Sequence, residues 1–385
     1  MALRKCAALV ACLMLLFAAF AGCSGGNTEQ DPPDTGQPGT QQPLEPETLT
    51  FTESAREDRI QWYGRCYHDA AEGTVSISNA SAGFEVAFYG TRLEAEIFAD
   101  ASQMRPPELS GNGYAYLFLD GETSYKEATL IELPDTGGAA QKVVLAEGLE
   151  EGEHTAKLIK VTEAKYTGAY VKSVTSDGGF RQPPARPAMK IEIVGDSISA
   201  GANAMRTQDA DLADTGSENS LASYGAVAAG MLGAEFNTVC RSGLLLTDSY
   251  ANIFDYYEKY GERDPAAWDF SLYVPDAVIV DLGTNDKLLG ISDAAVRAAY
   301  KRLLDLITEK YPQAYIFCCT GAMSSVSADI AAQLGAIAAG LAEEYGGRVT
   351  HVELPVVSTA GHPKEADHRS NGLYLTSQMR RVMQL

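Results

Sequence analysis

Ser197 is the residue of this sequence that is best placed to act as a nucleophile. It follows Gly195 and Asp196, directly after the apolar run of residues 191–194. A serine at a strand-to-helix turn presents its hydroxyl to a cleft, and nearby backbone N–H groups point at any oxyanion formed there. This geometry serves acyl transfer. Because Gly-Asp-Ser also makes ordinary turns, the rest of the machinery has to come from elsewhere in the chain.

Three later segments can supply that machinery. Gly243 ends Cys-Arg-Ser-Gly, Asn285 lies in Gly-Thr-Asn-Asp at 283–286, and His362 lies in Ala-Gly-His-Pro at 360–363. A serine hydrolase needs a base and oxyanion donors. His362 is the candidate base, and the donors are the N–H groups of Ser197 and Gly243 with the Asn285 amide. All follow predicted strands, at the sheet edge where α/β folds bind ligands.

These four blocks, in this order, resemble the SGNH (GDSL-type) hydrolases from about Lys190 to Leu385. The segment 268–276 is similar to the carbohydrate esterase family 2 branch, which places a β-sandwich before the SGNH domain. The resemblance implies an α/β fold, with a parallel sheet flanked by helices and preceded by an all-β jelly-roll sandwich. It also implies serine esterase chemistry without a cofactor, with Asp196 in a supporting position.

The sequence around the catalytic base departs from the family pattern at one point. SGNH enzymes usually carry Asp two or three residues before the catalytic histidine, where this chain has Ala360 and Thr359. An acid orients the imidazole and stabilises its charged form. Some family 2 esterases resemble this chain in working with a Ser–His dyad and a backbone carbonyl. The rival base is His368 with Glu365, although the family pattern gives His368 a supporting role.

The other three histidines, His68, His154 and His351, are assigned structural roles. None belongs to an H-x-x-x-H or Cys/His cluster with metal-ligand spacing. We therefore predict no metal site.

The first residues predict export and a lipid anchor. Arg4 and Lys5 precede an apolar run, and Phe-Ala-Gly-Cys at 20–23 is a near-match to a bacterial lipobox. Cleavage of residues 1–22 leaves Cys23 to carry lipid; a plain signal peptide is the alternative. Residues 23–48 are rich in Gly, Pro and Gln, which indicates a flexible tether. Fully extended, about 25 residues reach roughly 80 Å. We expect an enzyme anchored to the bacterial cell membrane or surface only through this lipid.

Charge and cysteine usage limit the partners. The formal charge of −21 disfavours nucleic acid, whose phosphates need basic surface. A neutral acetylated polysaccharide meets no such penalty. Cys318 and Cys319 are adjacent on a predicted strand and point to opposite faces, so no disulfide framework is evident.

The pattern of elements predicts two domains. Residues 49–180 contain short alternating segments with turn signals between them, which is typical of a sandwich or barrel. Residues 178–187 hold two Gly and three Pro and mark the boundary. In residues 188–385, helical patterns at 220–232, 294–311 and 328–345 separate strands, which predicts a parallel sheet with right-handed crossovers.

Aromatic residues gather after Gly243 and admit two interpretations. They can line a sugar-binding cleft or fill a helical core, and they are Tyr250, Phe254, Tyr256, Tyr257 and Tyr260. Trp268 stands before a strand and is predicted to lie in the core.

The sequence thus predicts an exported esterase that removes O-acetyl groups from polysaccharides of the acetylxylan or glucomannan type. The alternatives are a peptidoglycan, lipid or thioester acyl hydrolase, and a surface glycan-binding lipoprotein whose hydrolase site has decayed.

Overall fold

The computed structural model describes residues 45–51, 58–101, 112–207, 215–247, 251–323, 328–358 and 361–385. Residues Leu44–Leu385 form one compact unit. The predicted signal segment, the lipidation site Cys23 and nearly all of the predicted tether lie outside the described residues. So do Tyr250, Thr359 and Ala360. The first described strand, β1 (Glu47–Thr50), overlaps the end of the range assigned to the tether.

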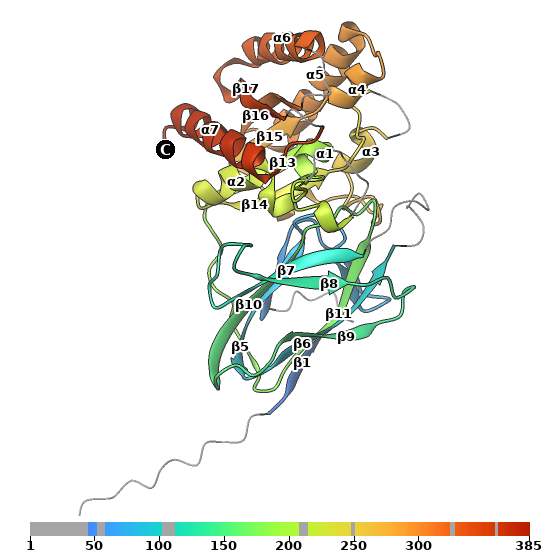
Figure 1. Cartoon of the computed structure of the whole chain (residues 1–385), viewed down its shortest axis with the longest axis vertical. Coiled ribbons are helices and arrows are strands. Elements are labelled where there is room, and N and C mark those ends of the chain that lie inside the picture. The colour runs from blue at the N-terminus through green and yellow to red at the C-terminus, as the bar shows by residue number, and fades with distance from the viewer. Residues whose placement is uncertain are drawn as a thin grey trace, which may run out of the picture. The chain divides into compact units, whose positions relative to one another are not determined.

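The N-terminal half is built from two antiparallel sheets, as the alternating segments predict (Figure 1). One sheet has the order β3-β4-β11-β6-β9, with β1 also on β11; its strands are β3 (Tyr67–Asp69), β4 (Thr74–Ser76), β11 (Gly168–Ser176), β6 (Leu93–Asp100) and β9 (Gln141–Ala146). The other has the order β12-β5-β10-β7-β8, with β2 also on β5; its strands are β12 (Phe180–Arg181), β5 (Gly83–Gly90), β10 (Gly152–Lys160), β7 (Gly113–Leu119), β8 (Thr129–Leu133) and β2 (Ile60–Tyr63).

The core of this β domain lies between the two sheets. In β6, every second residue from Leu93 is buried, because successive side chains on a strand point to opposite faces. Ile97 of one sheet and Phe84 and Leu158 of the other belong to one buried cluster. Burying a side chain of this size contributes about 1.5–3 kcal/mol, so this shared core holds the sandwich together.

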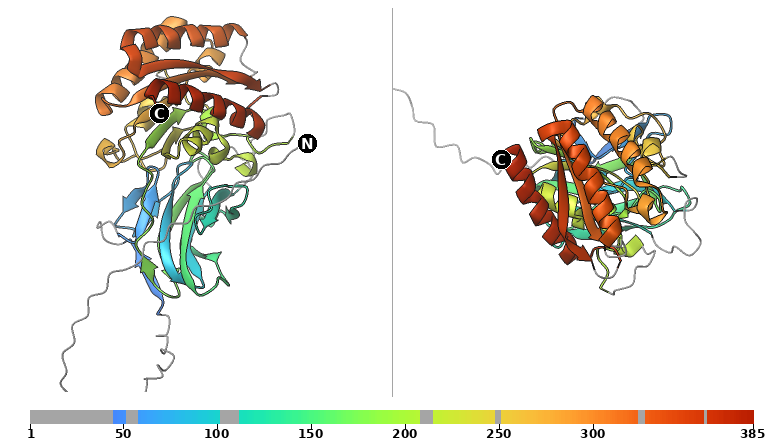
Figure 2. Two further views of the ribbon diagram at one scale, coloured as in Figure 1. Left: turned by 90° about the vertical axis from the view of Figure 1, so that its left-hand side faces the viewer. Right: turned by 90° about the horizontal axis from the view of Figure 1, so that it is seen from above.

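The C-terminal half contains a five-stranded parallel sheet of order β14-β13-β15-β16-β17. Its strands are β13 (Lys190–Gly195), β14 (Glu235–Cys240), β15 (Ala277–Asp281), β16 (Tyr315–Met323) and β17 (Val349–Ser358). The longer helices are α2 (Tyr224–Met231), α5 (Asp293–Lys310), α6 (Ala328–Tyr345) and α7 (Glu365–Met383). Figure 2 shows the sheet between its helices. The predicted fold class is confirmed.

Alternating residues divide the two faces of this sheet between pairs of helices. Val278 and Cys318 pack in the cluster that includes α5 and α6, whereas Ile279 and Cys319 pack in the cluster that includes α2 and α7. Cys318 and Cys319 are both free thiols and belong to opposite faces, as expected for adjacent residues of a strand.

One predicted helix is shorter than expected. The apolar pattern at 220–232 divides at Ser223, whose extended backbone (φ −62°, ψ 151°) separates a 3-10 turn, Ser220–Ala222, from α2. The Ser223 hydroxyl oxygen accepts from the Ala226 N–H, which makes Ser223 the N-cap of α2. Serine favours this position because its side chain competes for backbone hydrogen bonds.

A buried arginine joins the two halves. Arg65, from the turn after β2, donates to the backbone carbonyls of Tyr257 (2.5 Å) and Lys259 (2.8 Å). Its other terminal nitrogen lies 3.0 Å from the carboxylate of Glu192 in β13, and both side chains are almost fully buried. The β domain is therefore attached to β13, an inner strand of the parallel sheet. Across the described segments, the helices include none long and apolar enough to cross a membrane.

Candidate active site

Ser197 begins a one-turn helix, α1 (Ser197–Ala200), directly after β13. Asp196 caps this turn by accepting from the Ile198 N–H at 3.0 Å. A Cβ atom at Gly195 would lie 2.3 Å from the Ser199 hydroxyl, so only glycine permits so tight a turn between strand and serine. The local sequence therefore fixes where the Ser197 hydroxyl points.

His362 meets Ser197. The His362 Nε2 atom lies 2.7 Å from the Ser197 hydroxyl oxygen, although 165 residues separate the two in sequence. His362 stands between β17 and α7, and the N–H of Glu365, the first residue of α7, donates to the Ala204 carbonyl at 2.9 Å. A neutral imidazole at this distance accepts the serine proton, which is the geometry of a nucleophile and its general base.

Asn285 is held beside Asp196 at the start of α4 (Thr284–Leu288). Its side-chain nitrogen donates to the Asp196 carboxylate at 3.0 Å and to the Leu244 carbonyl at 3.1 Å. The amide thus joins the serine turn to the loop that follows β14. The structure brings three of the sequence-predicted residues, Asp196, Ser197 and Asn285, to one edge of the sheet.

Gly243 lies in the same loop after β14. Its φ of +81° is left-handed, a conformation that glycine adopts without strain. Among the described residues other than Gly243 and its two chain neighbours, no atom lies within 4 Å of a Cβ built at this position, so open space adjoins the residue.

Asp286 orders the rest of that loop, a role that the sequence did not reveal. Its buried carboxylate accepts from the N–H groups of Leu246 and Thr247, both at 2.9 Å, and from the Thr247 hydroxyl at 2.8 Å. Asp286 belongs to the Gly-Thr-Asn-Asp block, so the sequence did mark it as a residue of interest. Its partners lie about 40 residues earlier, and no local sequence pattern predicts such a contact.

A second buried carboxyl lies behind the serine turn. Asp281, the last residue of β15, accepts from the Tyr224 hydroxyl at 2.9 Å. Burial raises the pKa of Asp281 to about 7, and the hydrogen bond from Tyr224 opposes that rise. Burial and the nearby Asp281 charge also raise the pKa of Asp196 well above its ordinary value. Two buried carboxyl groups therefore lie in a poorly solvated environment next to the Gly-Asp-Ser turn.

The rival base, His368, is occupied elsewhere. Its Nδ1 atom accepts from the Tyr224 N–H at 3.2 Å, and burial lowers the pKa of His368 to about 3. Glu365, its expected partner, instead accepts from the Tyr125 hydroxyl at 2.5 Å and pairs with Lys126 at 2.6 Å. The geometry therefore places His362, and not the Glu365–His368 pair, against Ser197.

The remaining histidines make structural contacts. His68 contacts the Phe51 carbonyl at 2.6 Å, His154 contacts Asp120 at 2.9 Å, and His351 contacts the Thr320 hydroxyl at 2.8 Å. Within the described segments, no group of three or more His, Cys, Asp or Glu side chains is arranged to hold a metal ion.

The aromatic residues after Gly243 mostly pack into the protein. Tyr257 is fully buried and donates to Glu192 at 2.8 Å, and Phe254 lies under the Arg302 guanidinium at 3.7 Å. Tyr260 packs edge-on against Trp268, which is buried as predicted. For Tyr257, the core interpretation is therefore the correct one.

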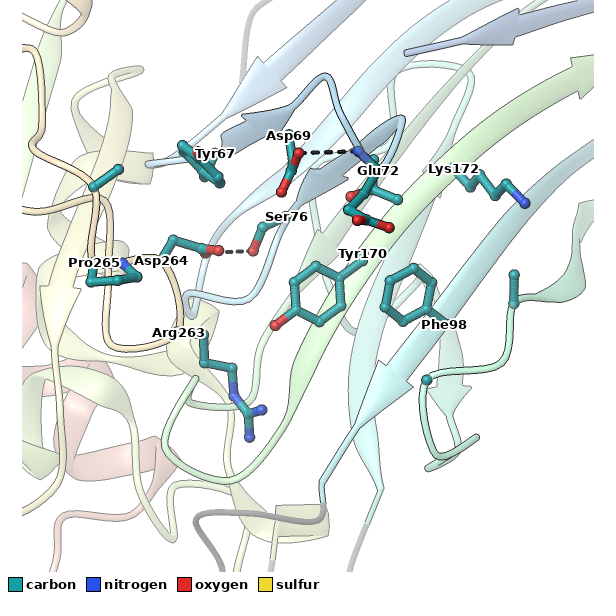
Figure 3. Close-up of a pocket in the computed structure, with 14 residues that line it drawn as sticks. Tyr67, Asp69, Glu72, Ser76, Phe98, Tyr170, Lys172, Arg263, Asp264 and Pro265 are labelled. Carbon is teal, nitrogen blue, oxygen red and sulfur yellow. Dashed lines mark hydrogen bonds between the residues drawn. The ribbon is translucent and has the colours of Figure 1, made fainter. Parts of the chain in front are cut away.

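A cavity of about 660 Å³ is lined by residues of the β domain and by the loop at 263–266. Figure 3 shows these side chains. Tyr67, Tyr170 and Phe98 lie in one cross-strand row with Ser76, because these residues are paired across four neighbouring strands. None of the candidate catalytic residues lines this cavity.

Two family models together match most of the chain. The GDSL-like Lipase/Acylhydrolase family matches residues 193–379, and the Carbohydrate esterase 2 N-terminal model matches residues 62–184. The two matches fall on the α/β half and the β half, respectively.

The chain is also similar to named esterases. The chain is 29% identical over 348 residues to an acetylxylan esterase / glucomannan deacetylase of Cellvibrio japonicus, covering 87% of this chain and 92% of that protein. It is 32% identical over 248 residues to the cellulase/esterase CelE of Acetivibrio thermocellus. That match covers 62% of this chain and 28% of CelE, so the chain spans less than a third of that relative.

A solved structure extends the likeness to the whole fold. A family two carbohydrate esterase from Cellvibrio japonicus superposes with a TM-score of 0.76 and 25% identity, covering 88% of this chain and 98% of that one. With an acylhydrolase model on the α/β half and a family-specific model on the β half, the chain belongs to the family 2 carbohydrate esterases, a group of carboxylic ester hydrolases.

Proposed function

We propose that this protein removes O-acetyl groups from a polysaccharide of the acetylxylan or glucomannan type. The observation that carries the proposal is the 2.7 Å contact between the Ser197 hydroxyl and His362 Nε2. The substrate class is supported by the Cellvibrio japonicus relative, which is an acetylxylan esterase / glucomannan deacetylase. The formal charge of −21 also favours a neutral polymer over an anionic one.

Acyl transfer begins at Ser197. Its oxygen attacks the acetyl carbonyl while His362 takes the hydroxyl proton, which gives a tetrahedral oxyanion. His362 then protonates the departing sugar oxygen, which leaves as a free hydroxyl, and the acetyl group remains as an ester on Ser197. Water, deprotonated by His362, attacks this acyl-enzyme. The proton returns to Ser197, and acetate leaves.

The oxyanion is assigned to three donors: the N–H groups of Ser197 and Gly243 and the Asn285 side-chain amide. In the free enzyme, that amide donates to Asp196 and to the Leu244 carbonyl. Both hydrogens of the amide thus have acceptors, so in this proposal the oxyanion shares or displaces the Leu244 carbonyl at one of them. The hydrogen bond to Asp196 keeps the amide oriented during that exchange, and a donor oriented in advance needs little reorganisation during reaction.

The base is assigned to a Ser–His dyad without an acidic third member. The sequence has Ala360 and Thr359 where the SGNH pattern usually places Asp. A backbone carbonyl takes over the orientation of His362 in this proposal. The energetic consequence is a weaker stabilisation of the imidazolium than a buried carboxylate provides.

The location is a separate proposal that rests on the first residues alone. We assign residues 1–22 to a signal segment and Cys23 to lipid attachment, which tethers the enzyme to the bacterial membrane. Expression of the full chain with a labelled fatty acid tests this: label should enter the wild type and be absent from Cys23→Ala. Label in both proteins would remove the assignment.

Acetate release from acetylated xylan and glucomannan tests the activity. The fragment from residue 45 onward is compared with Ser197→Ala and His362→Ala, and with His368→Asn as the variant of the rival base. We expect release to be lost in the first two and retained in the third. Release that survives in His362→Ala would move the base away from His362. If the wild type bound glycan without releasing acetate, the proposed esterase function would be replaced by the alternative of a glycan-binding protein.

A further inference from the structure

A loop of the β domain holds the residue that precedes Gly243. The connection between β10 and β11 passes over the loop after β14 and places Glu163 against Ser242. The Ser242 N–H donates to the Glu163 carboxylate at 2.5 Å, and the Ser242 hydroxyl donates to the other oxygen of the same carboxylate. Glu163 is 1% exposed and Ser242 is 9% exposed, so this contact lies inside the protein.

The other side of Ser242 is held as well. Its carbonyl oxygen accepts from Lys165 Nζ at 3.3 Å and from the Arg241 guanidinium at 3.1 Å. A trans peptide unit is planar, and its carbonyl and the following N–H therefore point in opposite directions. Because two cations fix where the Ser242 carbonyl points, they also fix where the Gly243 N–H points.

The energetics indicate that this contact does more than pack the two domains together. Burying a carboxylate costs free energy unless it is well hydrogen-bonded, and apolar side chains of similar size fill the same space without this desolvation cost. Burial raises the pKa of Glu163, and the two hydrogen bonds from Ser242 oppose that rise. The Glu163 N–H donates to the Glu218 carboxylate at 3.1 Å, which anchors the loop itself.

We propose that Glu163 and Lys165 are positioning residues that aim the Gly243 N–H at the oxyanion, so that the β domain completes the catalytic centre of the α/β domain. Neither side chain touches the reacting atoms. Glu163 sets the Ser242 backbone from its N–H side, and Lys165 sets it from its carbonyl side. This inference rests on the proposed oxyanion role of Gly243.

Three variants in the fragment from residue 45 onward test the role of Glu163. Glu163→Ala removes both acceptors, and Glu163→Gln keeps one acceptor and one donor for Ser242. Ser76→Ala is the matched control, because Ser76 also donates to a buried carboxylate across the two domains, that of Asp264, at 2.6 Å. Any loss due only to a weakened interface appears in Ser76→Ala as well.

Steady-state kinetics on a small acetyl ester is the first readout. We expect Glu163→Ala to lower kcat roughly tenfold to a hundredfold, below the full loss of an oxyanion donor, with KM changed less than about twofold. Glu163→Gln should recover most of that loss. Lys165→Met, which keeps the apolar stem, should lower kcat by a smaller factor, because Arg241 still holds the carbonyl.

Affinity for a small boronic acid is the second readout, since the serine adduct of a boronic acid carries its negative charge where the oxyanion forms. Glu163→Ala should bind the boronic acid more weakly by the same factor by which kcat falls. An equal loss of kcat in Ser76→Ala, or a folded Glu163→Ala with unchanged kcat and boronate affinity, would overturn the inference. A wild type that hydrolyses no acetyl ester would refute the proposed function instead. In that case the affinities of the variants for the boronic acid would still test the role of Glu163.

Discussion

At the scale of single residues, Asn285 is fixed before any substrate arrives. Its side-chain nitrogen is shared between the Asp196 carboxylate and the Leu244 carbonyl. These two acceptors lie on different segments, so the amide also keeps the serine turn and the loop after β14 in register. In its proposed oxyanion role, Asn285 acts on charge that develops in the transition state more than on the bound substrate.

Asn285→Ala should therefore lower kcat about a hundredfold, or about 3 kcal/mol in the barrier, with little change in KM. Steady-state kinetics on an acetyl ester measures both parameters. Asn285→Asp is the matched variant: it keeps the size but places a second acceptor against Asp196, and it should be at least as inactive. Full turnover by Asn285→Ala would remove Asn285 from the oxyanion site.

His368 ties stability to pH. Burial lowers its pKa to about 3 from an ordinary value of 6.5, so the folded protein keeps the ring neutral. Between these two values the unfolded chain binds a proton that the folded chain does not. The stability due to the neutral ring is therefore complete above pH 6.5 and is lost as pH falls toward 3, by at most about 1.4 kcal/mol per pH unit.

Urea denaturation at about pH 7.5, 6 and 5 tests this linkage. His368→Asn keeps an acceptor near the position of Nδ1 for the Tyr224 N–H and has no proton to gain, so it should lose less stability on acidification than the wild type. His154→Asn is the control, because hydrogen bonds raise the pKa of His154 against the effect of its partial burial, and this residue cannot account for acid loss. Parallel stability curves for wild type and His368→Asn would contradict the linkage.

At the scale of elements, the position of α7 depends on one close approach. A Cβ atom at Gly372 would lie 2.6 Å from the Val227 side chain and 2.8 Å from the Tyr224 carbonyl, both in α2. Glycine is therefore required where α7 crosses α2. His362 stands three residues before α7 begins, so a shift of this helix reaches the base.

Gly372→Ala should destabilise the protein by about 1–3 kcal/mol and lower the acetyl ester turnover. Gly340→Ala is the matched control within α6, since a Cβ there has no atom within 4 Å in the described part of the chain beyond the backbone of its own helix. That change should stabilise the protein by about 0.5–1 kcal/mol through helix propensity alone. Thermal unfolding and initial rates measure both effects, and equal behaviour of the two variants would show that the contact between α7 and α2 is not tight.

Elements with a clear period or turn were predictable from the sequence, and long-range partners were not. The β13 strand with its Gly-Asp-Ser turn, and α6 at 328–345, follow from local patterns. The division at Ser223 was missed because Ala and Leu continue the helical pattern through a residue that serves as a cap. Glu163 was missed because its partner Ser242 lies 79 residues away, and a lone glutamate in a loop carries no local signal.

At the scale of the whole molecule, Arg65 is a buried contact between the two halves. The guanidinium lies among the rings of Tyr257, Trp268 and Phe270, each within 5.6 Å of its central carbon. Arg65 also donates hydrogen bonds to Glu192 and to the carbonyls of Tyr257 and Lys259. This one side chain of the β domain therefore contacts both β13 and the segment 257–270 of the α/β domain.

Arg65→Met should destabilise the protein by about 3–5 kcal/mol, because Glu192 then stays buried without its cation. Arg92→Met is the control: Arg92 pairs with Glu94 and with the exposed Glu147, and its loss should change stability by less than about 1 kcal/mol. Chemical denaturation followed by fluorescence and circular dichroism checks both values. We also expect one transition for the wild type, and two separate transitions would contradict the coupling.

The burial of Arg65 also has a consequence for how the chain is made. The ribosome releases the β domain first, and Glu192 follows Arg65 by 127 residues. At about 5–20 residues per second, that interval is roughly 6–25 s. During this time the docking face around Arg65 has no partner and stays open to water and to other chains. A newly made β domain therefore depends on the second half of its own chain to close this face, and a message truncated between the two halves yields a protein that chaperones and proteases would recognise as unfinished.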